Sequence, residues 1–172
     1  MMGDDMKSKK ILAALDGSPA SQNALKYAVF LASKFECLLT GIYVVQEEKI
    51  GYWRFIDEHF RKELLRKGKE VLDDAEKIVN DRGMTLKTEI LHGAYPYEEI
   101  VKYIEKDTDI TTIVMGDHGM GLAADRRHLL GSTVERVMRE IAKREIPIAL
   151  TVVPYVSTDS GTCEIYAGPL CE

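Results

Sequence analysis

The chain alternates short apolar runs with longer segments of helical periodicity, and this alternation limits the folds open to it. Five runs have the length and β-forming composition of strands, and they span residues 10–15, 37–45, 85–91, 111–115 and 148–153. Between them, apolar residues recur on one helical face in a segment that begins at Pro19 and in residues 58–82, 95–105 and 132–144. Strands that alternate with helices form parallel sheets covered on both faces. We therefore expect a single-domain, doubly wound α/β fold with five parallel strands.

The two ends of the chain differ in composition from this middle part. Residues 1–8 are polar, and we expect them to form a flexible N-terminus. The α/β domain is expected to cover residues 9–153. The remaining tail, residues 154–172, contains Pro, Gly, Ser, Thr and three acids but no Lys or Arg. It is either a flexible end or an arm laid on a neighbouring molecule.

Composition limits the partners and the compartment. A net charge of -5 argues against nucleic acid or an anionic membrane as the main partner. No apolar run approaches the roughly 20 residues needed to cross a bilayer. The three cysteines, Cys37, Cys163 and Cys171, are too few and odd in number for a disulfide framework, and Cys37 falls in an apolar run that predicts a core position. We expect a cytoplasmic, reduced protein.

Two loops have the composition of an anion site. In open parallel sheets, ligands bind beyond the carboxyl ends of the strands, where the strand order reverses. Asp16-Gly17-Ser18 follows the first predicted strand, and residues 116–121 (GDHGMG) follow the fourth. Glycine permits positive φ and close approach of a ligand, and successive backbone N–H groups can cradle an anion. Gly131-Ser132-Thr133 opens the next helix, whose free N–H groups add a second anion-binding end.

The same residues also have explanations that need no ligand. A glycine after a strand is commonly a simple turn, and Asp16 has the character of a turn or N-cap residue. Ser132 and Glu135 have the spacing of a capping box. The pattern is neither the dinucleotide fingerprint, which follows the first strand, nor a P-loop, since no Gly-Lys-Ser/Thr occurs.

Taken in order, several segments resemble the universal stress protein family. They are KKILAALDGSPASQNALKYA at the start, LLTGIYVV in the second strand, TTIVMGDHG in the fourth, and then LLGSTVERVMRE and PIALTVV. The resemblance covers residues 9–153. It implies a sheet of strand order 3-2-1-4-5. It also implies a homodimer formed by the last strand, residues 148–153, which begins at Ile148 and ends at Val153.

Family members that bind ATP share a glycine, two residues, a glycine, nine residues and then Gly-Ser or Gly-Thr. The resemblance therefore implies ATP as the ligand, with Mg²⁺ or Mn²⁺ as a companion ion. It implies that Asp16 lies near the ribose or metal and that the backbone of Val44 meets the adenine. The residues that would hold the phosphates are Gly116, Gly119, Gly131, Ser132 and Thr133. The remaining members of the predicted nucleotide site are Ala14, Leu15, Met115 and His118.

This chain departs from that pattern at two points. Eleven residues separate Gly119 from Gly131, and the two extra ones are expected within residues 120–125. Asp117 places a carboxylate beside the expected phosphates, which is repulsive unless it points away or meets a metal ion. His118 fits a phosphate donor or a solvent-exposed loop residue. Arg126 and Arg127 fit either γ-phosphate contacts or solvated helix charges.

We find no convincing catalytic set in the sequence. The four histidines have no metal-ligand spacing, and no residue is an obvious candidate to position a water for hydrolysis. We expect a dimeric, ATP-dependent regulator or switch in the stress response, with an unknown protein partner. The alternatives are an interaction module of the same fold that binds no nucleotide and, ranked last, a slow ATP hydrolase or adenylyl transferase. The sequence leaves open whether the nucleotide is ATP, AMP or a cyclic form.

Overall fold

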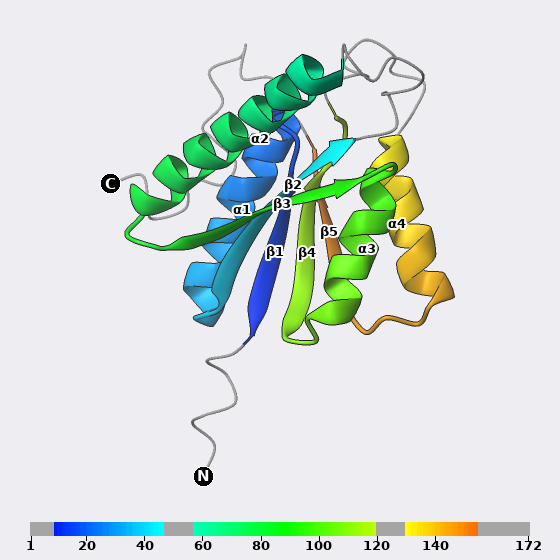
Figure 1. Cartoon of the computed structure of the whole chain (residues 1–172). Helices are drawn as coiled ribbons and strands as arrows, with labels where there is room; N and C mark the ends of the chain where they lie inside the picture. Colours follow the sequence, from blue (N-terminus) through cyan, green and yellow to red (C-terminus); the bar gives the residue numbers. More distant parts are fainter. Residues whose placement is uncertain (1–8, 47–56, 120–129, 155–172) are drawn as a thin grey trace.

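The computed structural model of the chain describes residues 9–46, 57–119 and 130–154. In chain order the elements are β1 (Lys10–Leu15), α1 (Pro19–Phe35), β2 (Leu38–Gln46), α2 (Asp57–Asn80), β3 (Leu86–Gly93), α3 (Pro96–Lys106), β4 (Ile110–Gly116), α4 (Ser132–Lys143) and β5 (Ala149–Val153) (Figure 1). Each expected strand and helix is present, and its ends lie within two residues of the prediction wherever both ends were predicted. The alternation in the sequence is therefore the alternation in the structure.

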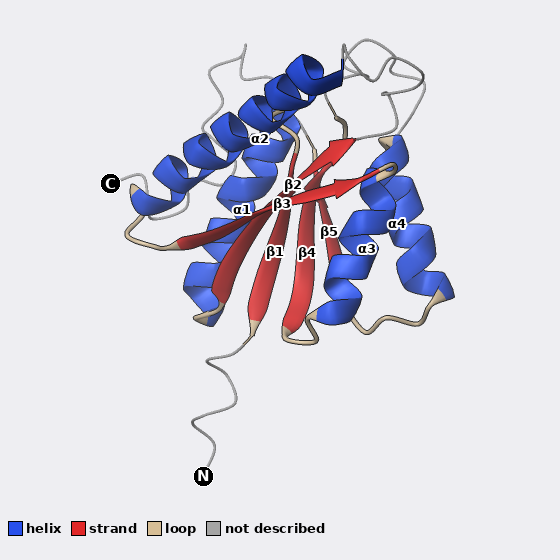
Figure 2. Cartoon of the chain, viewed as in Figure 1, coloured by secondary structure: helices blue, strands red, loops and turns tan. Residues whose placement is uncertain are grey.

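The five strands form one parallel sheet of order β3-β2-β1-β4-β5 (Figure 2). β1 lies at the centre, where Lys10 to Leu15 pair with Leu38 to Tyr43 of β2. Its other edge pairs with β4. The chain thus winds outward through β2 and β3 on one side and through β4 and β5 on the other, so the order reverses beside β1. The predicted fold class and strand order are both confirmed.

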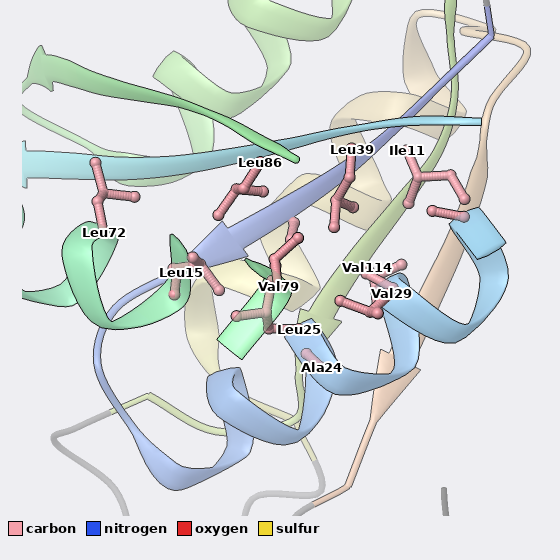
Figure 3. Packing of buried hydrophobic residues seen from close by; sticks show 14 of the residues in the cluster. Ile11, Leu15, Ala24, Leu25, Val29, Leu39, Leu72, Val79, Leu86 and Val114 are labelled. Carbon is pink, nitrogen blue, oxygen red and sulfur yellow. The ribbon is translucent and has the colours of Figure 1, made fainter. Parts of the chain in front are cut away.

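Helices cover both faces of the sheet, with α1 and α2 on one face and α3 and α4 on the other (Figure 1). Successive side chains of β1 point to opposite faces. Ile11, Ala13 and Leu15 therefore pack in the cluster under α1 and α2, which Figure 3 shows from close by. Leu12 joins the cluster under α3 and α4. Because both faces are buried, β1 is apolar from Ile11 to Leu15 rather than alternating.

The start of α1 follows the sequence prediction. Ser18 is the N-cap, and its Oγ accepts a hydrogen bond from the Ser21 N–H at 3.1 Å. Pro19 is the first helical residue, where its missing N–H costs no hydrogen bond. Glu36 ends the helix in the left-handed region, with φ 52°. The first loop of the expected site is therefore held by a well-defined helix start.

Two local predictions are wrong. Ser132 does not form a capping box with Glu135, because Gly131 takes the N-cap position with φ -65° and ψ 146° and no side chain caps α4. Ser132 is instead the first helical residue. Cys37 is half-buried rather than a core residue, because it lies in the turn between α1 and β2. The pKa of its thiol is raised, mainly by this partial burial.

The outer parts of the fold add two observations. β5 is an edge strand, and its residues Leu150, Thr151 and Val152 are half-buried. None of the helices within residues 9–46, 57–119 and 130–154 has the length and apolar character that a membrane crossing requires.

Leu25 of α1 offers a test of this packing. It is 1% exposed in the cluster between α1, α2 and the sheet. Leu25→Ala is expected to lower the free energy of unfolding by about 2–5 kcal/mol, because it removes buried methyl groups and leaves a cavity. Leu38→Ala is the control, since Leu38 is 55% exposed, and it should change stability by no more than about 0.5 kcal/mol. Urea unfolding measures both, and equal losses would contradict the packing described.

Candidate functional site

The turn after β1 is shaped by the side chain of Asp16 and by Gly17. Asp16 Oδ1 accepts a hydrogen bond from the Ser18 N–H at 2.9 Å, which closes a turn over Gly17. Gly17 has φ 83°, a conformation that side chains disfavour. Ser18 Oγ also donates to the carbonyl oxygen of His118 at 3.3 Å. The β1–α1 turn is therefore bonded directly to the loop that follows β4.

The loop after β4 is held by the backbone of Asp117. Its N–H donates to the carbonyl oxygen of Val153 at 3.0 Å, and its own carbonyl oxygen accepts from the Gly131 N–H at 2.7 Å. The first bond ties the loop to β5, and the second ties it to the N-terminus of α4. Three consecutive elements, β4, α4 and β5, thus meet at this residue.

The glycines of this region lie close to other parts of the protein, and Gly116 is the most tightly enclosed. A Cβ on Gly116 would lie 2.7 Å from the carbonyl carbon of Ala20 and 2.8 Å from the Ser21 nitrogen, both in the first turn of α1. A Cβ on Gly119 would lie 2.8 Å from Asp16 Oδ2. The conformational part of the glycine prediction is wrong for Gly116, Gly119 and Gly131, since none of them has positive φ. Close approach explains them.

A cavity of about 550 Å³ opens among these loops. It is lined by the ends of β1, β2 and β4, by the first turns of α1, α3 and α4, and by one side of α2. All eleven residues expected at the nucleotide site line it: Ala14, Leu15, Asp16, Val44, Met115, Gly116, His118, Gly119, Gly131, Ser132 and Thr133. The structure therefore brings the whole predicted set together at the carboxyl end of the sheet.

Asp117 is not among the lining residues, although both its neighbours are. Its side chain is 16% exposed, and Oδ2 lies 3.0 Å from Nδ1 of His118. His118, 26% exposed, lines the cavity. The carboxylate that the sequence placed beside the expected phosphates is therefore turned to the histidine rather than to the cavity.

Sequence reasoning missed several polar residues of the cavity, among them Tyr43 and Lys67. Tyr43 lines it from β2, and its pKa is raised, chiefly by burial and secondarily by the nearby Asp16 carboxylate. Lys67 lines it from α2. Tyr43 precedes the predicted Val44, but neighbouring side chains of a strand point to opposite faces, so its position gave no signal. A lysine within an amphipathic helix gives no signal either, because it is typical of a solvated surface.

Several predicted features lie outside the described residues. They are the two-residue extension expected within 120–125 and the side chains of Arg126 and Arg127. Among the described residues, no group of three or more His, Cys, Asp and Glu side chains is placed to hold a metal ion.

The comparison with known proteins agrees with this architecture. The sequence model of the universal stress protein family matches residues 7–144. The chain belongs to this family. A universal stress protein of Methanocaldococcus jannaschii is 37% identical over an alignment of 138 residues that covers 76% of this chain and 76% of the relative. The family resemblance inferred from the sequence segments is confirmed.

Solved universal stress proteins share the fold. UspA from Lactobacillus plantarum superposes with a TM-score of 0.71 at 26% identity, covering 86% of this chain and 98% of that structure. One from Archaeoglobus fulgidus in complex with dAMP has a TM-score of 0.60 at 16% identity, covering 86% and 98%. Another, in complex with cAMP, has a TM-score of 0.55 at 19% identity, covering 86% and 97%. The last two likenesses show the fold alone, and their nucleotides belong to those proteins.

The two loop glycines differ in what surrounds them, and this difference is testable. Gly116→Ala forces its new methyl group against α1 backbone, which cannot move alone, so we expect a loss of about 1–3 kcal/mol in unfolding free energy. Gly119→Ala meets only the end of the Asp16 side chain, so its loss should be smaller. Guanidinium unfolding of both variants measures the difference. A Gly116→Ala protein as stable as the parent would show that the two backbones are not in this contact.

Proposed function

We propose that this universal stress protein binds ATP in the cavity and acts as a nucleotide-dependent regulator or switch in the stress response. The observation that carries the proposal is the meeting of Gly116, Gly119, Gly131 and Ser132 with Asp16 around one cavity at the carboxyl end of the sheet. A volume of about 550 Å³ falls within the range of roughly 300–1,000 Å³ typical of small-molecule sites. A nucleotide that changes the order of these loops would present partner proteins with two distinguishable surfaces.

The chemistry of the lining supports assigned roles. The N-terminus of α4 has no side-chain cap, so the first-turn N–H groups of Ser132 and Thr133 have no side chain to satisfy them and suit phosphate oxygens. Gly116, Gly119 and Gly131 would let the phosphates approach the backbone. Asp16 would bind the ribose or an accompanying Mg²⁺ or Mn²⁺, most of whose ligands would come from phosphate and water. The adenine would contact the backbone of Val44, with Ala14, Leu15, Met115 and His118 completing the site.

The comparisons support an adenine nucleotide rather than another anion. Solved family members are in complex with dAMP and with cAMP. The Asp117 carboxylate is turned toward His118 and does not line the cavity, which lessens its direct repulsion of a triphosphate. We expect any hydrolysis to be slow. The cytoplasmic location stays a prediction drawn from the cysteine content.

We further propose that the protein is a homodimer through the last strand, residues 148–153. β5 is at the edge of the sheet, and an edge strand with apolar side chains is a liability unless covered. Sedimentation equilibrium should then give twice the chain mass of 19.4 kDa. A single species at the chain mass across the micromolar range would contradict the dimer.

The main test is the identity of the ligand. Small molecules released by denaturing freshly purified protein should include an adenine nucleotide, identified by mass spectrometry. Added Mg-ATP should raise thermal stability, since a ligand at about 100 times its Kd stabilises by about 2.7 kcal/mol. If no nucleotide is released and millimolar ATP does not stabilise the protein, the proposal is contradicted and the alternative of an interaction module is favoured. Rapid single-turnover cleavage of ATP would instead favour the hydrolase.

Ser132→Glu tests the place of binding. Ser132 is exposed at the first turn of α4 and lines the cavity. A glutamate there is compatible with the helix dipole, so the fold should persist, while its charge repels phosphate. We expect the affinity for ATP to fall at least about tenfold. Thr85→Glu is the control, since Thr85 is exposed and precedes β3 at the opposite end of the sheet. Calorimetric titration that finds equal ATP affinities for both variants would place the nucleotide elsewhere.

A further inference from the structure

Helix α2 contributes one wall of the cavity, although nothing in its sequence suggests a site. Leu64 and Lys67, one turn apart, both line the cavity. In Figure 1 the N-terminal part of α2 lies over the end of the sheet at which the strand arrows terminate, which is the end that holds the cavity. The long side chain of Lys67 therefore belongs to the site and not only to the solvated surface of the helix.

Two close contacts fix α2 in this position. A Cβ on Gly68 would lie 2.8 Å from Cδ1 of Tyr43, so the glycine lets the helix rest directly on the aromatic ring at the end of β2. One turn later, Val71 Cγ2 lies 2.8 Å from where a Cβ on Gly17 would be. The face of α2 that carries Leu64, Lys67, Gly68 and Val71 is thus packed on β2 and on the β1–α1 turn. The backbone of Lys67 is held at the cavity by its neighbours rather than by its own charge.

The charges on α2 are distributed unevenly. Arg66 is bonded to both Glu63 and Glu70, and Lys77 pairs with Asp74, all on the exposed side of the helix. Lys67 makes no hydrogen bond or ion pair with the residues that the structure describes. Acids of the helix therefore engage Arg66 and Lys77, whereas the ammonium at the cavity has no such partner among the described residues.

The cavity itself needs a cation if it is to hold a polyphosphate. Among its described lining residues, Asp16 carries a negative charge and Lys67 is the residue with a permanent positive charge. The glycine N–H groups supply partial charges only, and Asp16 repels phosphate unless a metal ion intervenes. An ammonium at this place offsets the carboxylate and adds a charge-assisted hydrogen bond to any phosphate within its reach.

We propose that Lys67 binds the phosphate chain of the nucleotide and makes the site select nucleotides by the number of their phosphates, favouring a triphosphate over a monophosphate. The proposal rests on the proposed function, since it assumes that an adenine nucleotide occupies this cavity. It adds a residue of α2 to the glycine loops. The larger negative charge of a triphosphate attracts the Lys67 ammonium more strongly than a monophosphate does, so the triphosphate gains more binding free energy from this lysine.

The test compares Lys67→Gln with Lys69→Gln. Both variants remove one positive charge from α2, but Lys69 is exposed and does not line the cavity. Calorimetric titration with Mg-ATP and with AMP gives the dissociation constants of both nucleotides for the two variants and for the parent. We expect Lys67→Gln to weaken ATP binding by about three- to tenfold and AMP binding by less than about twofold. Lys69→Gln should leave both constants within about twofold.

Two further readouts separate a phosphate contact from a structural role. Lys67→Arg keeps the charge, and it should restore most of the selectivity for ATP over AMP. The ATP affinity of the parent and of Lys69→Gln should decline with added salt more steeply than that of Lys67→Gln, because one screened charge pair is missing there. Urea unfolding without nucleotide should give the same stability for all of these variants.

The outcomes distinguish the two proposals. If the parent binds neither nucleotide, the proposed function fails, and the role of Lys67 fails with it. If the parent binds ATP but Lys67→Gln keeps its affinity and its selectivity, the proposed function stands and the role of Lys67 is overturned. The role is equally overturned if ATP and AMP weaken by the same factor in Lys67→Gln, or if Lys69→Gln matches Lys67→Gln.

Discussion

The direct contact of two backbones, at Gly116 and at the first turn of α1, is the constraint on which the site depends. Because position 116 has no side chain, the end of β4 reaches Ala20 and Ser21 with nothing between them. The loop after β4 therefore begins beside the β1–α1 turn, where Ser18 bonds the His118 carbonyl oxygen. Without this close approach the loops after β1 and β4 would lie farther apart and would not enclose the cavity together.

The strands, the helices and the loop glycines could be predicted from the sequence because each has a local cause. Apolar runs buried on both faces mark the strands, and glycines at strand ends mark the loops. No local sequence pattern predicts that Lys67 lines the cavity. Its position depends on the contact of Gly68 with Tyr43, which lie in distant parts of the chain. The first residue of α4 was predicted correctly, but its capping was misjudged for a related reason. Both Gly131 and Ser132 suit an N-cap, and the bond from the Gly131 N–H to Asp117 decides between them.

Asp117 shows how a residue type can mislead when its side chain and its backbone have separate tasks. From the sequence, its carboxylate counts as a charge within the phosphate loop. In the fold, that carboxylate lies against His118 and does not line the cavity. The backbone N–H of Asp117 is hydrogen-bonded to β5, and its carbonyl oxygen is hydrogen-bonded to the N-terminus of α4. The position contributes to the loop mainly through atoms that every residue except proline possesses.

These two peptide bonds have a consequence for how the outer edge of the sheet relates to the cavity. Val153 of β5 is bonded to the N–H of Asp117, and the carbonyl oxygen of Asp117 is bonded to the N–H of Gly131 at the cap of α4. No side chain takes part in this path. A molecule seated along β5 is thus two backbone hydrogen bonds from the helix end that lines the cavity, and a substitution at Asp117 other than proline keeps the groups that make both bonds.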